Sequence, residues 1–405
     1  MSAPSETIQP TPSSRIAVPP VTPNEPPHVL IGGAGLAGLF LGILLERAGI
    51  PYEIFERSAE PRSPNILPAF EQLGLLDELL SFSKPSFGVA MLTDKLKLIG
   101  KPLASNTDII GYDRVLFSRP DLHNMLFKKI PKEKIHMSKK IVTLDQDQDG
   151  VTVTFDDNTT ARGDILVGAD GAHSAVRQHL YKTLEMDGLL PKSDTEDTSK
   201  GYISLLGTTS SLDPSNNKKM LDEIRHFKTP YGTMGDLFDV TDIEKVSKVY
   251  FEDKLFETWT HGRTVLIGDG AGAVNAMQDA VLLANYLYDI TPTNFKNIKT
   301  ALSDYKNERF EAIKDQYPQS HISAKLIFGH TLWERIIRYI VFNWLPASLQ
   351  RKQMVKDTAY RPQANFLPKA PKRGTMDTIP QNHSKRIQRE KGEQETKERA
   401  AVLAI

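Results

Sequence analysis

The chain has 405 residues, of which 40% are hydrophobic and 25% are charged, and its formal net charge at pH 7 is +0. This length is sufficient for two or three substructures with a buried core, and the balanced charge argues against a broad basic face for nucleic acid. The chain contains no cysteine, which excludes disulfides, thiolate nucleophiles, iron–sulfur clusters and cysteine zinc sites.

Residues 1–27 are rich in Pro, Ser and Thr and have no apolar run of the kind that a secretory signal requires. We expect them to form a disordered leader. Residues 369–405 are charged and poor in apolar side chains. They predict a solvated tail with a short helix near its end.

A glycine-rich turn follows the first buried strand, which the apolar run over residues 29–31 predicts. Gly33, Gly35 and Gly38 fit the pattern G-x-G-x-x-G. In this pattern the first glycine permits a tight turn, the second lets a pyrophosphate approach the backbone, and the third lets the helix lie close to the strand. The turn therefore indicates a dinucleotide site.

The segments that follow the turn support this interpretation. Residues 36–48 predict a helix that is buried on most sides, and its N-terminus offers free N–H groups and a positive dipole end to phosphates. A second strand ends at Glu56, where an acid can accept hydrogen bonds from a ribose. Strand, turn, helix, strand and acid together predict a dinucleotide-binding βαβ unit, although they do not choose between FAD and NAD.

Two later segments repeat the strand-to-helix pattern. Residues 165–167 predict a buried strand that leads into Asp170 and Gly171, and an apolar run leads into Gly268 and Asp269. Between the first motif and these, Arg119 stands just before a short amphipathic helix. By itself this arginine is more typical of a surface residue than of a ligand.

The last of these segments has a rival interpretation as a second nucleotide site. Gly268, Gly270 and Ala273 fit G-x-G-x-x-A, and Asp289 lies at a distance where a ribose-binding acid could stand. A Rossmann unit needs a second strand before that acid, however, and the residues in between have the spacing of a continuing helix. We therefore interpret the stretch as the closing motif of a single cofactor site.

In this order the three segments resemble the class A flavoprotein monooxygenases, which are single-component FAD hydroxylases and epoxidases related to p-hydroxybenzoate hydroxylase. The nearest resemblance is to a fungal branch that acts on aromatic or isoprenoid-derived metabolites, and it covers residues 29–368. The resemblance implies cofactor contacts at the ADP half, along the reductant's path and at the ribityl chain. The implied FAD-binding residues are Gly33, Gly35, Gly38, Glu56, Arg119, Asp170, Gly171 and Asp269.

The resemblance also implies the reaction. NAD(P)H reduces FAD, O2 adds to the reduced flavin as a C4a-hydroperoxide, and a small apolar substrate of aromatic or isoprenoid origin is hydroxylated or epoxidised. Because the flavin carries the chemistry, we expect no catalytic side chain and no metal. We expect a cytoplasmic protein whose partners are this substrate and O2, with no nucleic acid.

The implied fold is α/β, with a discontinuous Rossmann-type FAD-binding domain, an interleaved and truncated mixed-sheet substrate layer, and a helical C-terminal part. Residues 88–103 predict a hairpin within the substrate layer. The expected boundaries are 28–85, 110–182 and 255–320 for the FAD domain, 86–109 and 183–254 for the substrate layer, 321–368 for the C-terminal helices and 369–405 for the tail.

Three segments are shorter than the resemblance implies. Gly270 follows Asp269 directly, the chain passes from Glu56 almost at once to the next helix, and few strands follow residues 200–215. The first two segments shape the pocket of the flavin ring in relatives, and the third forms part of the wall over the substrate. A non-catalytic, degenerate FAD-binding paralogue and an incomplete gene model remain as alternatives to a working enzyme.

Residues 326–346 form the most apolar stretch of the C-terminal part, but they carry charges and are no membrane span. Trp333, Ile336, Ile337 and Ile340, together with Val341, recur at helical spacing. Our preferred interpretation is a helix packed on the body, and the alternative is a helix that contacts a membrane surface.

Overall fold

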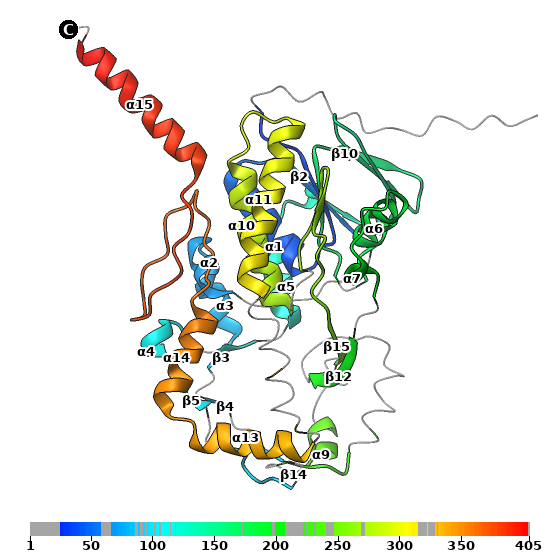
Figure 1. The fold of residues 1–405 in the computed structure, drawn as a ribbon, viewed down its shortest axis with the longest axis vertical. Helices are drawn as coiled ribbons and strands as arrows, with labels where there is room; N and C mark the ends of the chain where they lie inside the picture. Colours follow the sequence, from blue (N-terminus) through cyan, green and yellow to red (C-terminus); the bar gives the residue numbers. More distant parts are fainter. Residues whose placement is uncertain are drawn as a thin grey trace, which may run out of the picture.

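The chain is described by a computed structural model (Figure 1). The structure describes residues 25–403 apart from 58–65, 207–221, 240–246, 269–271, 315–321 and 323–328, and apart from shorter breaks at 86–87, 90–91, 94, 101–102, 105–106, 114, 118, 172, 197–198, 223–224, 230–231 and 330. The fold is α/β, as the sequence predicted, with a helical C-terminal part.

A six-stranded sheet forms the centre of the molecule, in the order β16–β17–β11–β1–β2–β7. Its neighbouring strands run parallel, except that β16 pairs antiparallel with β17. The central strands are buried along their whole length, as expected of a parallel sheet that is covered on both faces. The strands are β1 (Val29–Gly32), β2 (Tyr52–Glu56), β7 (Ile135–Met137), β11 (Ile165–Gly168), β16 (Thr260–His261) and β17 (Thr264–Leu266).

Helices cover one face of this sheet, and in Figure 1 α1, α10 and α11 lie alongside one another. The α1 helix is apolar on nearly all sides and packs between the sheet and α10, so the largest hydrophobic core lies in this layer. The helices and turn of this side are α1 (Leu36–Ala48), α2 (Leu67–Gln72), α3 (Leu76–Phe82), α5 (Arg119–Phe127), η1 (Lys132–Lys134), α10 (Gly272–Tyr288) and α11 (Phe295–Lys314).

A small antiparallel sheet and α6 cover the other face and enclose a second core. Buried and partly exposed residues alternate along β9, as they do in a strand with one face against the core. The elements are β8 (Ile141–Gln146), β9 (Val151–Phe155), β10 (Thr160–Gly163), α6 (Ala175–Met186) and α7 (Lys192–Thr195).

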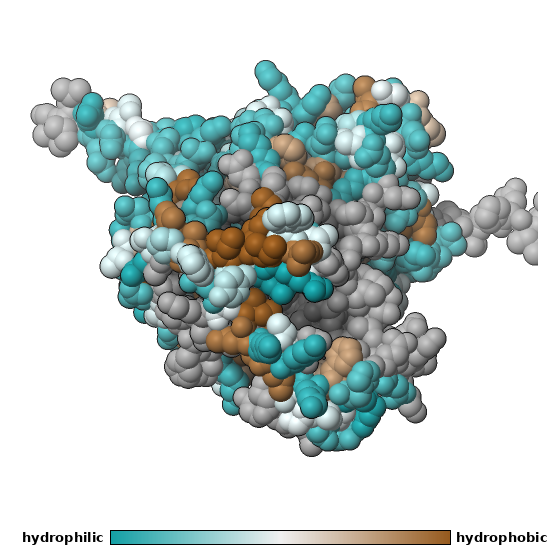
Figure 2. All heavy atoms as spheres, turned by 60° about the horizontal axis from the view of Figure 1, so that its bottom comes forward, coloured by the Kyte–Doolittle hydropathy of each residue, from teal (hydrophilic) through white to brown (hydrophobic). Residues whose placement is uncertain are grey.

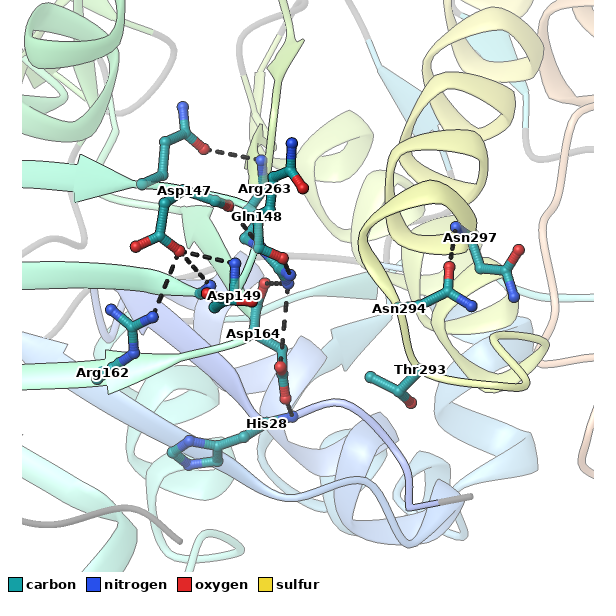
Figure 3. A network of polar contacts seen from close by, with 12 residues as sticks. His28, Asp147, Gln148, Asp149, Arg162, Asp164, Arg263, Thr293, Asn294 and Asn297 are labelled. Carbon is teal, nitrogen blue, oxygen red and sulfur yellow. Dashed lines mark hydrogen bonds and ion pairs between the residues drawn. The ribbon is translucent and has the colours of Figure 1, made fainter. Parts of the chain in front are cut away.

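Arg263 ties the turn between β8 and β9 to the main sheet (Figure 3). Its buried guanidinium donates to the carbonyl oxygens of Asp147, at 3.0 Å, and of Asp164, at 2.9 Å, and to that of Gln148. Burial lowers the pKa of this arginine, which the neighbouring Asp164 opposes. The Asp164 carboxylate in turn accepts from the backbone N–H of His28 at 2.8 Å. The network closes the amino-terminal edge of the sheet, opposite the edge where the glycine-rich turn lies.

Short elements lie below the main sheet in Figure 1. The expected hairpin is confirmed, because β4 pairs antiparallel with β5 and Leu92 bridges to Leu98. The longest pair is β12 with β15, also antiparallel. The elements are β3 (Lys84–Pro85), β4 (Gly88–Val89), β5 (Leu103–Ala104), α4 (Thr107–Ile110), β6 (Val115–Leu116), β12 (Ser199–Leu206), β13 (Lys228–Thr229), β14 (Gly232–Thr233), α9 (Met234–Asp239) and β15 (Ser247–Asp253).

The C-terminal part consists of α13 (Leu332–Trp344), α14 (Ala347–Thr358), an extended segment over residues 359–384, and α15 (Lys385–Leu403). The extended segment is held on the body, because the amide of Gln72 bonds with both the N–H and the carbonyl oxygen of Ala364. The α15 helix points away from the body (Figure 1) and is longer than the short helix expected from the sequence.

The preferred sequence-based interpretation of α13 was wrong. Its apolar side chains do not pack on the body: Trp333 is 74% exposed, Ile336 40%, Ile337 48% and Ile340 52%. Of its apolar side chains only Val341 and Phe342 are half-buried, and Phe342 lies on the side opposite Trp333. Among the described residues no helix combines the length and the hydropathy that a membrane span needs.

Candidate cofactor site

The glycine-rich turn joins β1 to α1, and its three glycines meet different surroundings. Gly33 has φ +106°, and a Cβ there would lie 2.5 Å from the carbonyl oxygen of Ala169. A Cβ at Gly38 would overlap the carbonyl oxygen of Gly33. The fold itself therefore requires these two glycines.

Gly35 is different, because no described residue lies close enough to explain its missing side chain. Its backbone is extended, with φ −66° and ψ −173°. The closest atom to a Cβ there would be the carbonyl oxygen of Ala169, at an ordinary contact distance of 3.7 Å. The described residues thus leave space in front of Gly35 for a group that approaches the backbone closely.

The N-terminus of α1 opens into the same space. Gly35 is its N-cap and provides no side-chain cap, and the first turn contains no acidic residue. The first three N–H groups of a helix have no partner within the helix, and here they belong to Leu36, Ala37 and Gly38. With the positive end of the helix dipole, these donors favour an anion such as a pyrophosphate.

Three hydrogen bonds fix the turn in this shape. The N–H of Gly33 donates to the carbonyl oxygen of Phe55 at 2.8 Å. The N–H of Ala34 donates to Oε2 of Glu56, also at 2.8 Å. The imidazole Nε2 of His123 lies 2.8 Å from the carbonyl oxygen of Ala34. Glu56, the predicted ribose acid, thus stands at the turn and helps to hold it.

His123 is a site residue that our sequence analysis missed. It lies on α5 and is fully buried, and burial lowers its pKa to about 4, so its ring is neutral near pH 7. Because a carbonyl oxygen only accepts, Nε2 carries the proton and donates it to Ala34. The sequence signal that could have identified His123 was its position next to the buried Leu122, on the inward face of the predicted helix. Arg119 begins the same helix, but its side chain lies outside the described part of the chain.

The second strand-to-helix turn, from β11 to α6, lies beside the first because β11 pairs with β1. Here the helix end is closed. The Asp170 carboxylate accepts from Oγ of Ser174 at 2.5 Å and from the N–H of Ala175 at 2.6 Å. Ser174 caps the helix further by accepting from the N–H of Arg177 at 2.9 Å. Asp170 therefore shapes this turn, while the adjacent Gly171, with φ +81°, has open space where a Cβ would be.

The third turn runs from β17 to α10, and a buried ion pair between Asp279 and Arg309 holds it in place. The N–H of Gly268 donates to Oδ2 of Asp279 at 2.8 Å, and Oδ1 of the same carboxylate accepts from Nε of Arg309 at 2.5 Å. Both side chains are almost completely buried. The guanidinium also donates to the side chains of Asn275, at 2.8 Å, and Gln278, at 3.1 Å. Asp269 and Gly270 themselves lie outside the described residues.

The structure also decides between the two interpretations of this third turn. Residues 272–288 form one continuous helix, as expected, so no strand precedes Asp289. The Asp289 carboxylate instead accepts from Oγ of Ser384 at 2.5 Å and from the N–H of Lys385 at 2.9 Å, at the start of α15. This acid is a helix cap, and the stretch is no second Rossmann unit.

Comparisons with known proteins agree with this geometry. Residues 27–194 match the family described as FAD binding domain. A FAD-dependent monooxygenase of Penicillium shearii, esdpE, is 27% identical, with 78% of this chain and 81% of the relative covered. Another, ptmM of Penicillium ochrochloron, is 25% identical over 74% of this chain and 88% of the relative. The chain has a FAD-binding domain. It is similar to the class A FAD-dependent monooxygenases, and it is an oxidoreductase.

Solved structures show the same fold. HpxO of Klebsiella pneumoniae, complexed with FAD and uric acid, superposes with a TM-score of 0.66 at 18% identity, covering 82% of this chain and 96% of that chain. PqsL of Pseudomonas aeruginosa superposes with a TM-score of 0.58 at 19% identity, covering 77% and 98%.

The alignment with the Penicillium shearii relative also bears on the shortened segments. The alignment is 392 positions long. Only 78% of the 405 residues of this chain enter it, and these are too few to occupy all of its positions. The relative therefore has residues within the aligned region that this chain lacks.

Proposed function

We propose that this chain uses NAD(P)H and O2 to hydroxylate or epoxidise a small apolar substrate, of aromatic or isoprenoid-derived structure, against a bound FAD. The observation that carries the proposal is the uncapped N-terminus of α1 next to the open face of Gly35. Overall, substrate, O2, NAD(P)H and a proton give oxygenated substrate, water and NAD(P)+. When bound, FAD supplies the redox and oxygen chemistry.

The residues of this chain would bind and orient the cofactor. Gly33, Gly35 and Gly38 would let the pyrophosphate lie against the start of α1. Glu56 would accept hydrogen bonds from the adenosine ribose. We assign the reductant's side of the flavin to Asp170 and Gly171, the ribityl chain to Asp269, and a further contact to Arg119.

We further propose that residues 28–85, 110–182 and 255–320 form the FAD domain, and that 86–109 and 183–254 form the substrate layer. Residues 321–368 would brace the FAD domain, with 369–405 as a tail. These ranges place three of the small two-stranded pairs, β4–β5, β12–β15 and β13–β14, in the substrate layer, where they would exclude water from the reacting centre.

We also propose that this cytoplasmic protein contacts a membrane surface through residues 326–346. The support is the exposure of the apolar face of α13, which forms a brown band in Figure 2. An exposed helical face with Trp at both ends and charges on the other side is typical of helices that lie in a bilayer interface.

The test is the visible absorption spectrum of the purified chain before and after addition of FAD, followed by NAD(P)H oxidation and product analysis under 18O2. We expect the flavin band to shift on binding, and we expect the product to contain 18O. A flavin-bound protein that consumes no NAD(P)H with any candidate substrate would instead be the non-catalytic paralogue. A folded protein without flavin would contradict the assignment of the site.

A further inference from the structure

The β4–β5 hairpin lies against α13 at one end of the molecule (Figure 1). Gly100, on its returning arm, is in backbone contact with Phe342, so closely that a Cβ at Gly100 would overlap the phenylalanine. Gly100 is buried by this contact. The hairpin and the helix therefore form one surface.

Hydrogen bonds hold the described residues at the tip of the hairpin, and their leucines are exposed to solvent. The N–H of Leu96 donates to the carbonyl oxygen of Thr93 at 2.9 Å, and the N–H of Lys97 donates to its Oγ1 at 3.1 Å. Leu92, Leu96 and Leu98 are all exposed. Leu96 has φ +58°, a backbone conformation that suits Gly or Asn and strains a leucine. The fold alone gives no reason for a large apolar side chain at this position.

The α13 helix adds a second apolar strip to this surface. Trp333 and Trp344 stand at its two ends, with the exposed Ile336, Ile337 and Ile340 between them. Figure 2 shows the strip as a continuous brown band, with further brown side chains across a narrow teal strip. Exposed apolar surface of this extent is unusual in a monomer and marks a contact.

The charges on this surface indicate which kind of partner it contacts. Lys95 and Lys97 flank Leu96 at the tip of the hairpin, and Lys352 is exposed on the adjoining α14. Within the described part of the chain none of the three forms an ion pair. The described acids nearby are engaged, since Glu334 closes the capping box of α13 and Asp108 pairs with Arg351. Lysines that alternate with leucines suit a surface with anionic headgroups above an apolar interior.

We infer that the hairpin tip and α13 dock together on an anionic lipid bilayer, with the leucines and tryptophans inserted and Lys95 and Lys97 at the headgroup phosphates. This inference rests on the membrane contact proposed above and deepens it, since it adds a second element and a lipid class. The monooxygenase assignment does not depend on it.

The experiment is sedimentation of the full-length protein with two kinds of vesicle, phosphatidylcholine alone and phosphatidylcholine with about one third phosphatidylserine. We expect preference for the anionic vesicles, and we expect the double variant Lys95→Glu/Lys97→Glu to weaken that binding at least about tenfold, since each basic residue near such a surface contributes substantially. The matched control, Lys296→Glu/Lys299→Glu on the exposed side of α11, makes the same change of charge on the body and should bind like the wild type.

The other outcomes overturn the inference in distinguishable ways. Equal binding of the hairpin variant and the wild type would leave α13 as the contact and reject the role of the hairpin. Absence of binding to either vesicle would reject both membrane statements. A concentration-dependent dimer that Trp333→Glu dissociates would show that a second copy covers the surface. FAD content, measured in the same samples, reports on the cofactor site independently and verifies that each variant is folded.

Discussion

Replacing Gly35 by valine tests whether this glycine is required for FAD binding or for the stability of the fold. The backbone at Gly35 has φ −66° and ψ −173°, which any residue adopts. A Cβ would approach the described residues no closer than 3.7 Å. We therefore expect the free energy of unfolding of the cofactor-free variant to stay within about 1 kcal/mol of the wild type.

FAD binding should respond very differently, because the valine would occupy the space into which the helix N–H groups point. Hydrogen bonds to a charged group contribute about 1.5–3 kcal/mol each. Loss of two of them amounts to about 3–6 kcal/mol, so the Kd for FAD should rise at least about 100-fold. Quenching of FAD fluorescence on titration with protein measures this, and urea unfolding followed by circular dichroism measures the fold.

Gly38→Ala is the matched control, since its new Cβ would overlap the carbonyl oxygen of Gly33. This variant should lose stability and FAD binding together. Wild-type FAD affinity in Gly35→Val would show that the pyrophosphate does not lie at the start of α1. An unfolded Gly35→Val protein would refute the argument that the space belongs to the ligand.

Three further predictions concern buried polar groups that stabilise the fold. Asp279→Ala leaves the buried guanidinium of Arg309 without its carboxylate, so the free energy of unfolding in urea should fall by about 3–5 kcal/mol; a change below about 1 kcal/mol would contradict the buried pair. The pKa of His123 is lowered to about 4 in the folded protein, so between that pH and about 6.5 the unfolded chain binds the extra proton. Stability should fall as the pH drops through this range, by up to about 3 kcal/mol, and a urea series should show a shallower slope for His123→Asn than for the wild type. Arg263→Met leaves three carbonyl oxygens without their donor, and thermal unfolding should show a loss of about 2–4 kcal/mol, with an unchanged midpoint counting against this network.

The part of the site that sequence patterns could predict is the part that the backbone makes. Glycine spacing after an apolar run reports a tight turn and close helix packing, and Gly33 and Gly38 fulfil both requirements. The acid at Glu56 follows from the length of one βαβ unit. These are local constraints, and they can be derived from local sequence.

The supporting contacts could not be derived in this way, because they join distant segments. His123 reaches the first turn from a helix 89 residues further along the chain, and Arg309 reaches Asp279 from 30 residues away. Periodicity places such residues on buried faces but does not name their partners. The same limit explains the error at α13, because an amphipathic pattern shows that a face is apolar without showing what covers it.

The two neighbouring turns that follow β1 and β11 at the carboxyl edge of the sheet differ in how the N–H groups of their helices are satisfied. Both join a buried parallel strand to a helix, and β1 and β11 are paired in register. At α6 an aspartate and a serine satisfy the helix end, so an anion there would meet the Asp170 carboxylate. At α1 the corresponding residues are glycine and small apolar residues, so the N–H donors stay available and the dipole is uncompensated. Of these two turns, the one at α1 leaves its helix N–H groups available, and this difference is why we propose the pyrophosphate at α1 and not at α6.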